Sequence, residues 1–278
     1  MNHLIVDSGC DVTAELVEHE GCMLSRVPLN LQVEDTVYVD DDNIDLNKYL
    51  AHMEASPIAV KTSAPSPSLF TEKFKLGDNV FVVTLSSKLS ATYQSALAAK
   101  DMYLEEYGKK FIHVFDSFSA AIAEGVIAMK ISELSKIGTG ATEIVEQVNT
   151  YIENMRTFFI LDKFDNLVKT GRVNPYVAKV ASVLNIKPVC TEEGGQIKMV
   201  DKSRGFPKAL ARMMKLIETE VSDIEQRVIG ITHVQAYEKA LATKEALLAH
   251  FKPRDIVIIE CRGITTTYAN RGGVILAL

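Results

Sequence analysis

Three short apolar runs in the first half of the chain are each followed by polar residues and then by a helical pattern. The runs cover residues 3–6, 79–84 and 111–115, and the helices are expected over 11–21, from about 91 and over 120–134. Continuous apolar strands that alternate with amphipathic helices are typical of a parallel sheet covered by helices on both faces. The pattern therefore predicts an N-terminal α/β domain.

The polar residues after the three runs read DSGCD, LSSKLS and DSFS. Parallel strands present their C-terminal ends at one edge of the sheet, where open α/β sheets bind ligands. We therefore expect these three turns to converge. Between the first two runs, residues 29–39 indicate a hairpin or an extended excursion. Residues 62–67 (TSAPSP) indicate a rigid loop, in which Ser66 and Pro67 suit the start of a helix.

The second half of the chain mixes strands, helices and a hairpin. Strands are expected over 158–161, 228–232 and 256–260, and helices up to 169, over 174–184, 208–221 and 237–250. A hairpin is expected from 186–191 and 196–200, across Glu193–Gly194–Gly195. The sequence thus predicts two α/β domains, residues 1–155 and residues 156–278.

Composition narrows the class of protein. A formal net charge of −6 and a pI near 5.6 argue against a nucleic-acid partner, which usually requires a basic surface. The N-terminus lacks the basic region of a signal peptide, and no run approaches the roughly 20 apolar residues of a membrane span. Four scattered cysteines without CxxC spacing indicate reduced thiols. We expect a cytoplasmic protein without a membrane span.

Hydroxyl side chains are crowded into the turn at residues 84–96, TLSSKLSATYQSA. Helix capping explains one or two of them, because Ser and Thr oxygens accept from free amides at helix starts. The excess points to donors for a carboxylate or a phosphate ester. The hydroxyl residues considered together are Thr62, Ser63, Ser86, Ser87, Ser90 and Thr92.

Acidic residues at the strand ends allow several roles. We interpret Asp7 and Asp116 as braces of the ligand loops and Asp11 as a helix cap. The run at residues 40–42, with Asp45, indicates a solvated turn before a helix, because it lacks the glycine and glutamate of a calcium loop. The six histidines have no metal-ligand spacing, so no metal site is expected.

Two arginines could recognise an anion. Arg172 follows a glycine at the start of a helix capped by Asn174, and a surface salt bridge explains it equally well. Arg271 precedes two glycines, which could form an anion-binding backbone nest or a plain turn.

Several stretches together resemble the DegV family, which includes the fatty-acid-binding subunits of bacterial fatty acid kinase. Residues 61–67 (KTSAPSP) are similar to its KTSxPSP loop, and residues 85–96 to its SSxLSGTYQSA segment. Further similarities are FDS at 115–117, TGR at 170–172, NIKP at 185–188 and RG at 204–205. The resemblance runs over nearly the whole chain, and it implies the two-domain α/β fold of that family.

The resemblance also implies a function. A long-chain fatty acid would lie in a buried tunnel, and a separate kinase subunit would phosphorylate its carboxyl group, so the chain itself would be a carrier without cofactors and not an enzyme. Carried over by position, Thr62 and Ser90 would bind the carboxylate, with Asp7, Ser8 and Ser63 in support. The remaining assignments are phosphotransfer support by Arg172 and Tyr268 and ligand binding near Asn270 and Arg271. Transient contact with a membrane surface is also expected of such a carrier.

The chain departs from the family pattern in the loop on the phosphorylation side. Where the family has a GTHxGPG-like run, this chain has residues 266–272, TTYANRG, so that Tyr268 stands in place of a histidine. Ala64, Lys88 and Ala91 also replace family residues. Two alternative functions stay open: a small-carboxylate hydrolase or lyase that uses Ser90 or Ser117 as nucleophile, and a regulatory lipid-sensing protein that no longer delivers substrate.

Overall fold

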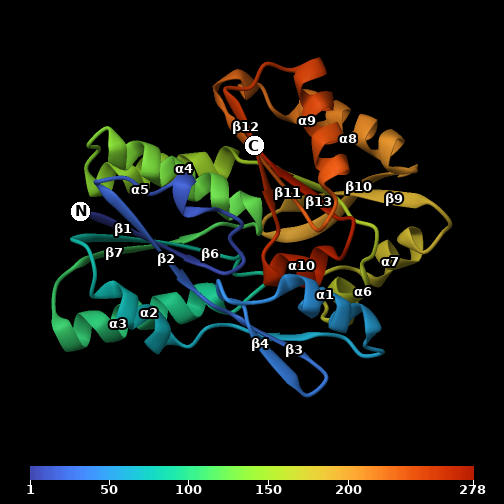
Figure 1. Ribbon diagram of the computed structural model, residues 1–278. Helices are drawn as coiled ribbons and strands as arrows, with labels where there is room; N and C mark the ends of the chain where they lie inside the picture. The colour runs from blue at the N-terminus through green and yellow to red at the C-terminus, as the bar shows by residue number, and fades with distance from the viewer.

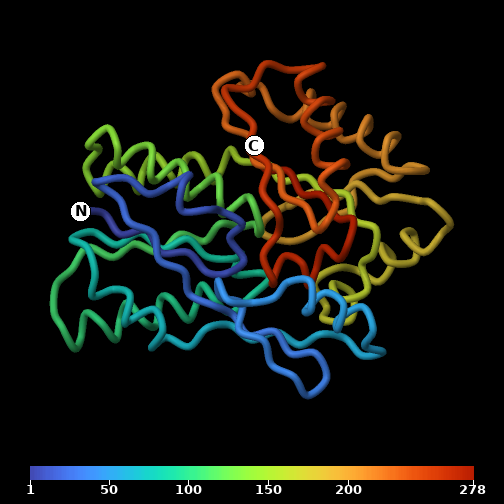
Figure 2. The backbone as a smooth tube through the Cα atoms, in the orientation of Figure 1, coloured from blue at the N-terminus to red at the C-terminus, as the bar shows by residue number.

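The computed structural model describes residues 1–278 and contains three β-sheets of four, six and three strands. Figure 1 shows the four-stranded sheet between two pairs of helices, with the six-stranded sheet beside it. In the tube of Figure 2, the C-terminal segment runs back into the middle of the molecule and lies against segments from the first sixty residues. Segments from the two halves of the chain therefore meet in the middle of the molecule.

The four-stranded sheet has the strand order β2-β1-β6-β7, and all of its neighbouring strands are parallel. Its strands are β1 (Asn2–Asp7), β2 (Cys22–Val27), β6 (Asn79–Thr84) and β7 (Phe111–Asp116). The three predicted apolar runs form β1, β6 and β7, and they lie side by side. The predicted parallel sheet is confirmed.

Helices cover both faces of this sheet because its strands are apolar on both faces. Leu4 and Val6 of β1 pack with α4 and α5, whereas Ile5 between them packs with α2 and α3. Each fully buried aliphatic side chain contributes about 1.5–3 kcal/mol. The helices are α2 (Pro67–Phe74), α3 (Thr92–Tyr107), α4 (Ile122–Lys136) and α5 (Ala141–Asn154).

The prediction of a helix over residues 11–21 is wrong. That segment holds only a short 3₁₀ turn, Ala14–Leu16, and it leads directly into β2. The guanidinium of Arg26 on β2 donates to the carbonyl oxygens of Cys10 and Val12 at 2.7 Å each. These bonds hold the segment in an irregular path, and they satisfy carbonyls that a helix would have paired internally.

The six-stranded sheet is mixed and has the order β10-β9-β8-β13-β11-β12. Only β11 and β12 pair in parallel, and β9 and β10 form the expected hairpin. Helices α8 (Phe206–Glu220) and α9 (Tyr237–His250) cover one face (Figure 1). The strands are β8 (Thr157–Ile160), β9 (Ile186–Glu193), β10 (Gln196–Arg204), β11 (Val228–His233), β12 (Asp255–Glu260) and β13 (Val274–Ala277). A 3₁₀ turn, Ile224–Gln226, precedes β11.

The three-stranded sheet is antiparallel and confirms the hairpin expected over residues 29–39. It consists of β3 (Asn30–Val33), β4 (Thr36–Val39) and β5 (Lys61–Ser63) in the order β4-β3-β5. A shared apolar cluster packs it against short helices from both halves of the chain. These helices are α1 (Leu46–Ala55), α6 (Asp165–Lys169), α7 (Pro175–Ala181) and α10 (Gly263–Ala269).

The two halves of the chain share a core. Helix α4 packs against β11 and β13 as well as against its own sheet, and a Cβ atom at Gly230 of β11 would overlap Ile122 of α4. The strands of the four- and six-stranded sheets lie on either side of residue 155, and the division into domains at that residue stays a prediction. None of the helices combines the length and the apolar character that crossing a bilayer requires.

Candidate functional site

A cavity lies between the turns that follow β6 and β7, the six-stranded sheet and helix α10. It encloses about 820 Å³ of empty space, open solvent at its edge included. Hydrophobic residues make up 13 of the 22 that line it, so most of its wall suits an apolar ligand. The larger apolar side chains are Leu29, Leu85, Leu89, Phe159, Leu161, Leu167, Ile197, Ile264 and Ile275.

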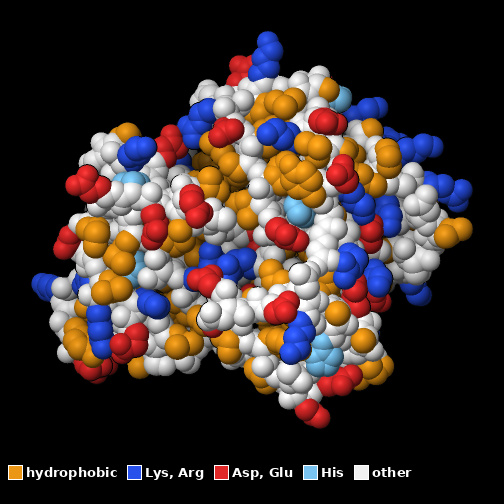
Figure 3. Space-filling model, viewed as in Figure 1, with side chains coloured by type: hydrophobic (Ala, Val, Ile, Leu, Met, Phe, Trp, Pro, Cys, Tyr) orange, Lys and Arg blue, Asp and Glu red, His pale blue; other side chains and the backbone are white.

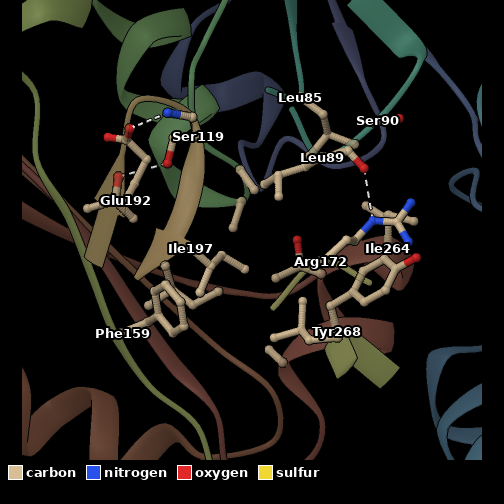
Figure 4. A pocket seen from close by; sticks show the side chains of 18 of the residues that line it. Leu85, Leu89, Ser90, Ser119, Phe159, Arg172, Glu192, Ile197, Ile264 and Tyr268 are labelled. Carbon is tan, nitrogen blue, oxygen red and sulfur yellow. Dashed lines mark hydrogen bonds between the residues drawn. The ribbon is translucent and has the colours of Figure 1, made fainter. Parts of the chain in front are cut away.

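One side of the cavity carries Thr62, Ser90, Arg172 and Tyr268, which we call the Arg172 end (Figure 4). The hydroxyl of Thr62 lies 2.8 Å from that of Tyr268. Arg172 donates from Nε to the carbonyl oxygen of Leu89 at 2.9 Å, and its guanidinium lies 4.9 Å from the centre of the Tyr268 ring. The structure thus brings together four residues that the sequence had assigned to the site.

Each of these side chains comes from a different element. Thr62 is on β5 and pairs with Leu31 of β3, whereas Ser90 lies just before α3. Arg172 follows α6 after Gly171, whose φ of +74° favours glycine. Tyr268 is on α10, near the C-terminal end of the chain. The Arg172 end therefore exists only when both halves of the chain are folded together.

Two buried carboxylates hold the start of α10 and so position Tyr268. Asp40 accepts hydrogen bonds from the amides of Gly263 and Ile264, at 3.0 and 2.8 Å. Asp11 accepts from the amide of Arg262 at 2.7 Å and from the hydroxyl of Thr232 at 3.2 Å. Carboxylates stabilise helix N-termini because they satisfy free amides and oppose the helix dipole.

These contacts correct two sequence interpretations. Asp11 does cap a helix start, but one that lies 251 positions along the chain from it, and not the helix expected to begin at residue 11. Asp40 is fully buried and does not lie in a solvated turn, whereas Asp45 caps α1. A Cβ atom at Gly263 would lie 2.5 Å from Asp40 Oδ1, so the close approach of that carboxylate requires glycine.

Burial governs the ionisation of these acids. Desolvation raises the pKa of the Asp11 carboxyl to about 7 and that of Asp7 to about 6, although both accept backbone hydrogen bonds. Burial also raises the pKa of Glu124 well above its usual range, and both of its carboxyl oxygens lack a hydrogen-bond partner. These three acids form a buried group beneath the polar turns.

The predicted bracing of the turns by Asp7 and Asp116 is confirmed. Asp7 accepts from the amides of Gly9 and Leu85, at 2.7 and 2.8 Å, and so ties the turn after β1 to that after β6. Asp116 accepts from the amides of Ser87 and Phe118, at 3.1 and 3.0 Å, and ties the turn after β6 to that after β7. The three polar turns therefore converge as expected.

The other predicted ligand residues do not line the cavity. Asp7 and Ser8 are fully buried beside it, and the Ser8 hydroxyl accepts from the amide of Leu29 at 3.0 Å. The side chain of Ser63 is exposed, whereas that of Asn270 is buried and donates to the carbonyl oxygen of Tyr268. Arg271 forms an ion pair with Glu54 at 3.0 Å. A role for these residues in support of the site stays a prediction.

The segment at residues 271–273 is a turn and not an anion nest. The amide of Gly272 donates to the carbonyl oxygen of Val234, and that of Gly273 donates to that of Asn270. Both amides are therefore occupied by the backbone. Elsewhere, no group of three His, Cys, Asp or Glu side chains could hold a metal ion, and all four cysteines are free and buried.

Capping and bracing account for part of the hydroxyl-rich turn. Ser86 donates to the carbonyl oxygen of Gly195 at the tip of the β9–β10 hairpin, at 2.8 Å. Ser90 accepts from the amide of Thr92 at 3.3 Å, and the two hydroxyls lie 2.8 Å apart. Ser90 still lines the cavity, and a role of its hydroxyl in ligand binding stays a prediction.

The opposite side of the cavity is also polar, which the sequence did not predict. Ser119, Thr157 and Glu192 lie there, and we call this the Ser119 end (Figure 4). The hydroxyls of Ser119 and Thr157 lie 2.8 Å apart, and Glu192 accepts from the amide of Gly195 at 2.6 Å. Burial raises the pKa of Glu192. Only Ser119 gave a sequence signal, as part of the DSFS turn.

Neither proposed nucleophile is activated for catalysis. The Ser117 hydroxyl donates to the carbonyl oxygen of Ser119 and accepts from the amide of the same residue. Ser90 is paired with Thr92, and neither serine is hydrogen-bonded to a histidine. A serine hydroxyl needs an adjacent base to act as a nucleophile. The site geometry therefore gives no support to the hydrolase alternative.

Comparison with known proteins identifies the family. The family model described as "Uncharacterised protein, DegV family" matches residues 2–277. The chain belongs to the DegV family. A DegV domain-containing protein of Streptococcus pyogenes serotype M1 is 32% identical over 274 residues, which are 98% of this chain and 97% of the relative.

Solved structures of DegV proteins share the fold over the full chain. A DegV family protein of Ruminococcus gnavus, described with vaccenic acid, has a TM-score of 0.94 at 37% identity and covers 100% of this chain and 99% of its own. A DegV protein of Eubacterium eligens, loaded with heptadecanoic acid, has a TM-score of 0.93 at 28% identity, with coverage of 100% and 99%. The Fatty Acid Kinase (Fak) B3 protein of Streptococcus pneumoniae, loaded with linoleic acid, has a TM-score of 0.93 at 30% identity, with coverage of 99% and 98%.

Tyr268 of this DegV protein lies beside two other residues that the sequence predicted for the site. The tyrosine lies on the wall of the cavity, between Thr62 and the guanidinium of Arg172. A phenol can donate and accept a hydrogen bond at neutral pH, but unlike histidine it does not become cationic. Any permanent positive charge on the wall of the cavity therefore comes from Arg172.

Proposed function

We propose that this protein binds one long-chain fatty acid in the cavity and presents its carboxylate, at the Arg172 end, to a separate kinase that forms the acyl phosphate. One observation carries the proposal: an apolar cavity ends at two uncharged hydroxyls beside an arginine. The fatty acids described with the R. gnavus, E. eligens and S. pneumoniae proteins support it, because these proteins share the fold at 28–37% identity.

The apolar wall supplies most of the affinity. Burial of a methylene contributes about 0.8 kcal/mol, so a chain of roughly fourteen methylenes gains about 11 kcal/mol before the costs of binding. A hydrogen bond to a charged group adds about 1.5–3 kcal/mol. The hydroxyls of Thr62 and Ser90 therefore need only satisfy and orient the carboxylate.

Uncharged donors suit a carboxylate that must react. A lysine or arginine in direct contact would lower the basicity of the carboxylate and make it a weaker nucleophile toward ATP. In the structure the Thr62 hydroxyl is paired with Tyr268, and the bound carboxylate would take the place of one partner in that hydrogen bond.

Arg172 is proposed to act in phosphotransfer or in kinase docking. Only its Nε donates to a protein atom, so both terminal nitrogens are free to bind a phosphate or a carboxylate of the kinase. The ring of Tyr268 fixes the plane of the guanidinium through a cation–π contact. Tyr268 would thus support phosphotransfer by holding Arg172.

We further propose that the protein works in the cytoplasm and touches a membrane surface transiently to exchange its ligand. Helix α7 begins three residues after Arg172 and carries the exposed side chain of Tyr176, and Val183 and Leu184 are exposed just after it. Exposed apolar side chains on and just after a short helix suit brief contact with a bilayer interface.

The test is equilibrium binding to protein stripped of lipid. We expect one equivalent of oleic or palmitic acid to bind with submicromolar affinity, and the methyl esters to bind more weakly because they lack the charge. With a fatty acid kinase and ATP, the loaded protein should yield acyl phosphate. An absence of measurable affinity for any long-chain acid would contradict the proposal.

A further inference from the structure

We propose that the Ser119 end of the cavity binds an uncharged polar group at the far end of the acyl chain, so that the protein accepts terminally hydroxylated fatty acids. This inference rests on the proposed function, and it names the substrate class more closely. The residues that carry it are Ser119, Thr157 and Glu192, which lie opposite Arg172 across the apolar wall (Figure 4).

The hydroxyl pair of Ser119 and Thr157 has one proton that no protein atom accepts in the structure. Ser119 and Thr157 each carry one O–H, and the single hydrogen bond between them uses one of the two protons. Neither hydroxyl is bonded to any other protein atom. Both side chains are only 3% exposed, so bulk water does not readily satisfy the second O–H. One hydroxyl donor therefore lacks a protein acceptor at the end of an apolar cavity.

Glu192, at the same end of the cavity, offers an acceptor for the proton of a ligand hydroxyl. Its Oε1 accepts from the amide of Gly195 within the β9–β10 hairpin, and no protein donor bonds to Oε2. A carboxylate can accept about four hydrogen bonds, so most of this capacity is unused. The Glu192 side chain is partly buried, and this burial raises its pKa.

The free O–H and the carboxylate at the Ser119 end favour a hydroxyl group on the ligand. A hydroxyl can accept from the free O–H and donate to the carboxylate at the same time, which a methyl group cannot do. An unsatisfied buried donor costs about 1–3 kcal/mol, so a methyl terminus leaves that cost in place. A second carboxylate on the ligand would be repelled by Glu192.

The two ends together also set the direction of binding. The Arg172 end offers the hydroxyls of Thr62 and Ser90 as donors and the Ser119 end has a carboxylate, so the acid group of the ligand is favoured at the first and disfavoured at the second. An ω-hydroxy acid satisfies both ends in one orientation.

The experiment measures affinity ratios on delipidated protein. Unbranched acids of roughly twelve to eighteen carbons are compared with their ω-hydroxy counterparts and with the corresponding dicarboxylic acids. At the chain length that spans the cavity, we expect the ω-hydroxy acid to bind at least as tightly as the methyl-ended acid. A purely apolar end would disfavour the hydroxyl by about tenfold or more. The dicarboxylic acid should bind least tightly at every length.

Variants test whether the preference for ω-hydroxy acids comes from the Ser119 end of the cavity. The double variant Ser119→Ala/Thr157→Val should lower the ratio of ω-hydroxy to methyl-ended affinity by about tenfold. Glu192→Gln keeps an acceptor for the Gly195 amide, removes the charge and should improve dicarboxylic acid binding by a similar factor. Thr71→Val is the matched control, because it removes a buried hydroxyl that does not line the cavity, and it should leave both ratios unchanged.

The ratio of ω-hydroxy to methyl-ended acid affinity tests this inference separately from the proposed function. If methyl-ended acids bind and the ω-hydroxy acid is disfavoured about tenfold at every length, the inference is overturned while the proposed function stands. The same holds if the double variant leaves the ratio unchanged, since ordered water would then satisfy the Ser119 end. If no acid of any class binds, both are overturned.

Discussion

The hydroxyl of Thr62 lies 2.8 Å from the hydroxyl of Tyr268, although 206 positions separate the two residues in the chain. This contact joins β5 of the small sheet to α10, and it lies on the wall of the cavity beside Arg172. The Arg172 end of the cavity is therefore built from both halves of the protein. Figure 3 shows charged side chains of both signs scattered over the face of the molecule that is seen in Figure 1.

Removal of the two head-group hydroxyls should weaken fatty-acid binding. Thr62→Val and Ser90→Ala each delete one donor to the carboxylate, and we expect the affinity to fall by about tenfold in each case. Ser87→Ala is the matched control, because its hydroxyl bonds to no protein atom and does not line the cavity. Titration calorimetry on delipidated protein measures all three. Equal losses in the control and the two variants would show that the assignment of the head-group residues is wrong.

Replacement of Arg172 should separate binding from phosphorylation. Arg172→Ala leaves the apolar wall and both hydroxyls in place, so affinity for the acid should change by less than about threefold. Loss of a charged donor to the transferred phosphate should lower the rate of acyl-phosphate formation by about 100-fold. The two readouts are acid affinity and acyl phosphate formed with the kinase. Lost binding with retained phosphorylation would show that Arg172 serves the ligand and not the transfer.

A larger side chain at Ala120 should shorten the cavity. Ala120 lines the cavity next to Ser119, so Ala120→Leu places bulk at the end remote from Arg172. Each methylene that can no longer be buried costs about 0.8 kcal/mol, and affinity for the longest acids should fall by about tenfold while shorter acids bind as before. Ala98→Leu, on the exposed face of α3, is the control. A uniform loss at all chain lengths would show that the acyl tail does not reach Ala120.

The buried Asp11 should make stability depend on pH in a defined direction. Its pKa is raised by burial from 3.8 to about 7, so the folded protein binds a proton that the unfolded chain releases above pH 4. Stability from this group is greatest below about pH 4 and falls as the pH rises to about 7, by up to about 1.4 kcal/mol per pH unit.

Asp11→Asn isolates this effect from the other acids. Asparagine can still accept from the amide of Arg262, and it does not titrate. The free energy of unfolding of the wild type, minus that of the variant, should therefore increase as the pH falls from 8 to 5. Urea denaturation at a series of pH values measures it. A difference that is flat, or that has the opposite slope, would show that Asp11 is ionised throughout in the folded protein.

Local sequence patterns were enough to predict the strands of the parallel sheet and the hydroxyl-rich turn. The continuous apolar runs identified β1, β6 and β7, and the hydroxyl-rich turn identified Ser90, because burial on both faces and turn chemistry leave direct traces in sequence. The amphipathic helix α5 was missed although Ile144, Val148 and Ile152 recur at every fourth position, so its signal was available.

Other features depend on contacts that no local pattern records. Helix α10 reads GITTTYA, in which β-branched threonines have low helix propensity, and carboxylates of Asp11 and Asp40 from the other half of the chain hold its start. The Ser119 end is assembled from a turn, from β8 and from β9, so its residues become neighbours only in the folded protein. Contacts between distant parts of the chain, and not local helix or strand propensity, determine both helix α10 and the Ser119 end.

Native mass spectrometry of the purified protein tests the central claim most directly. The account predicts a complex whose extra mass equals one long-chain fatty acid, which disappears on delipidation and returns when one equivalent of acid is added. A single unliganded mass, together with no uptake of long-chain acid by the delipidated protein, would contradict it.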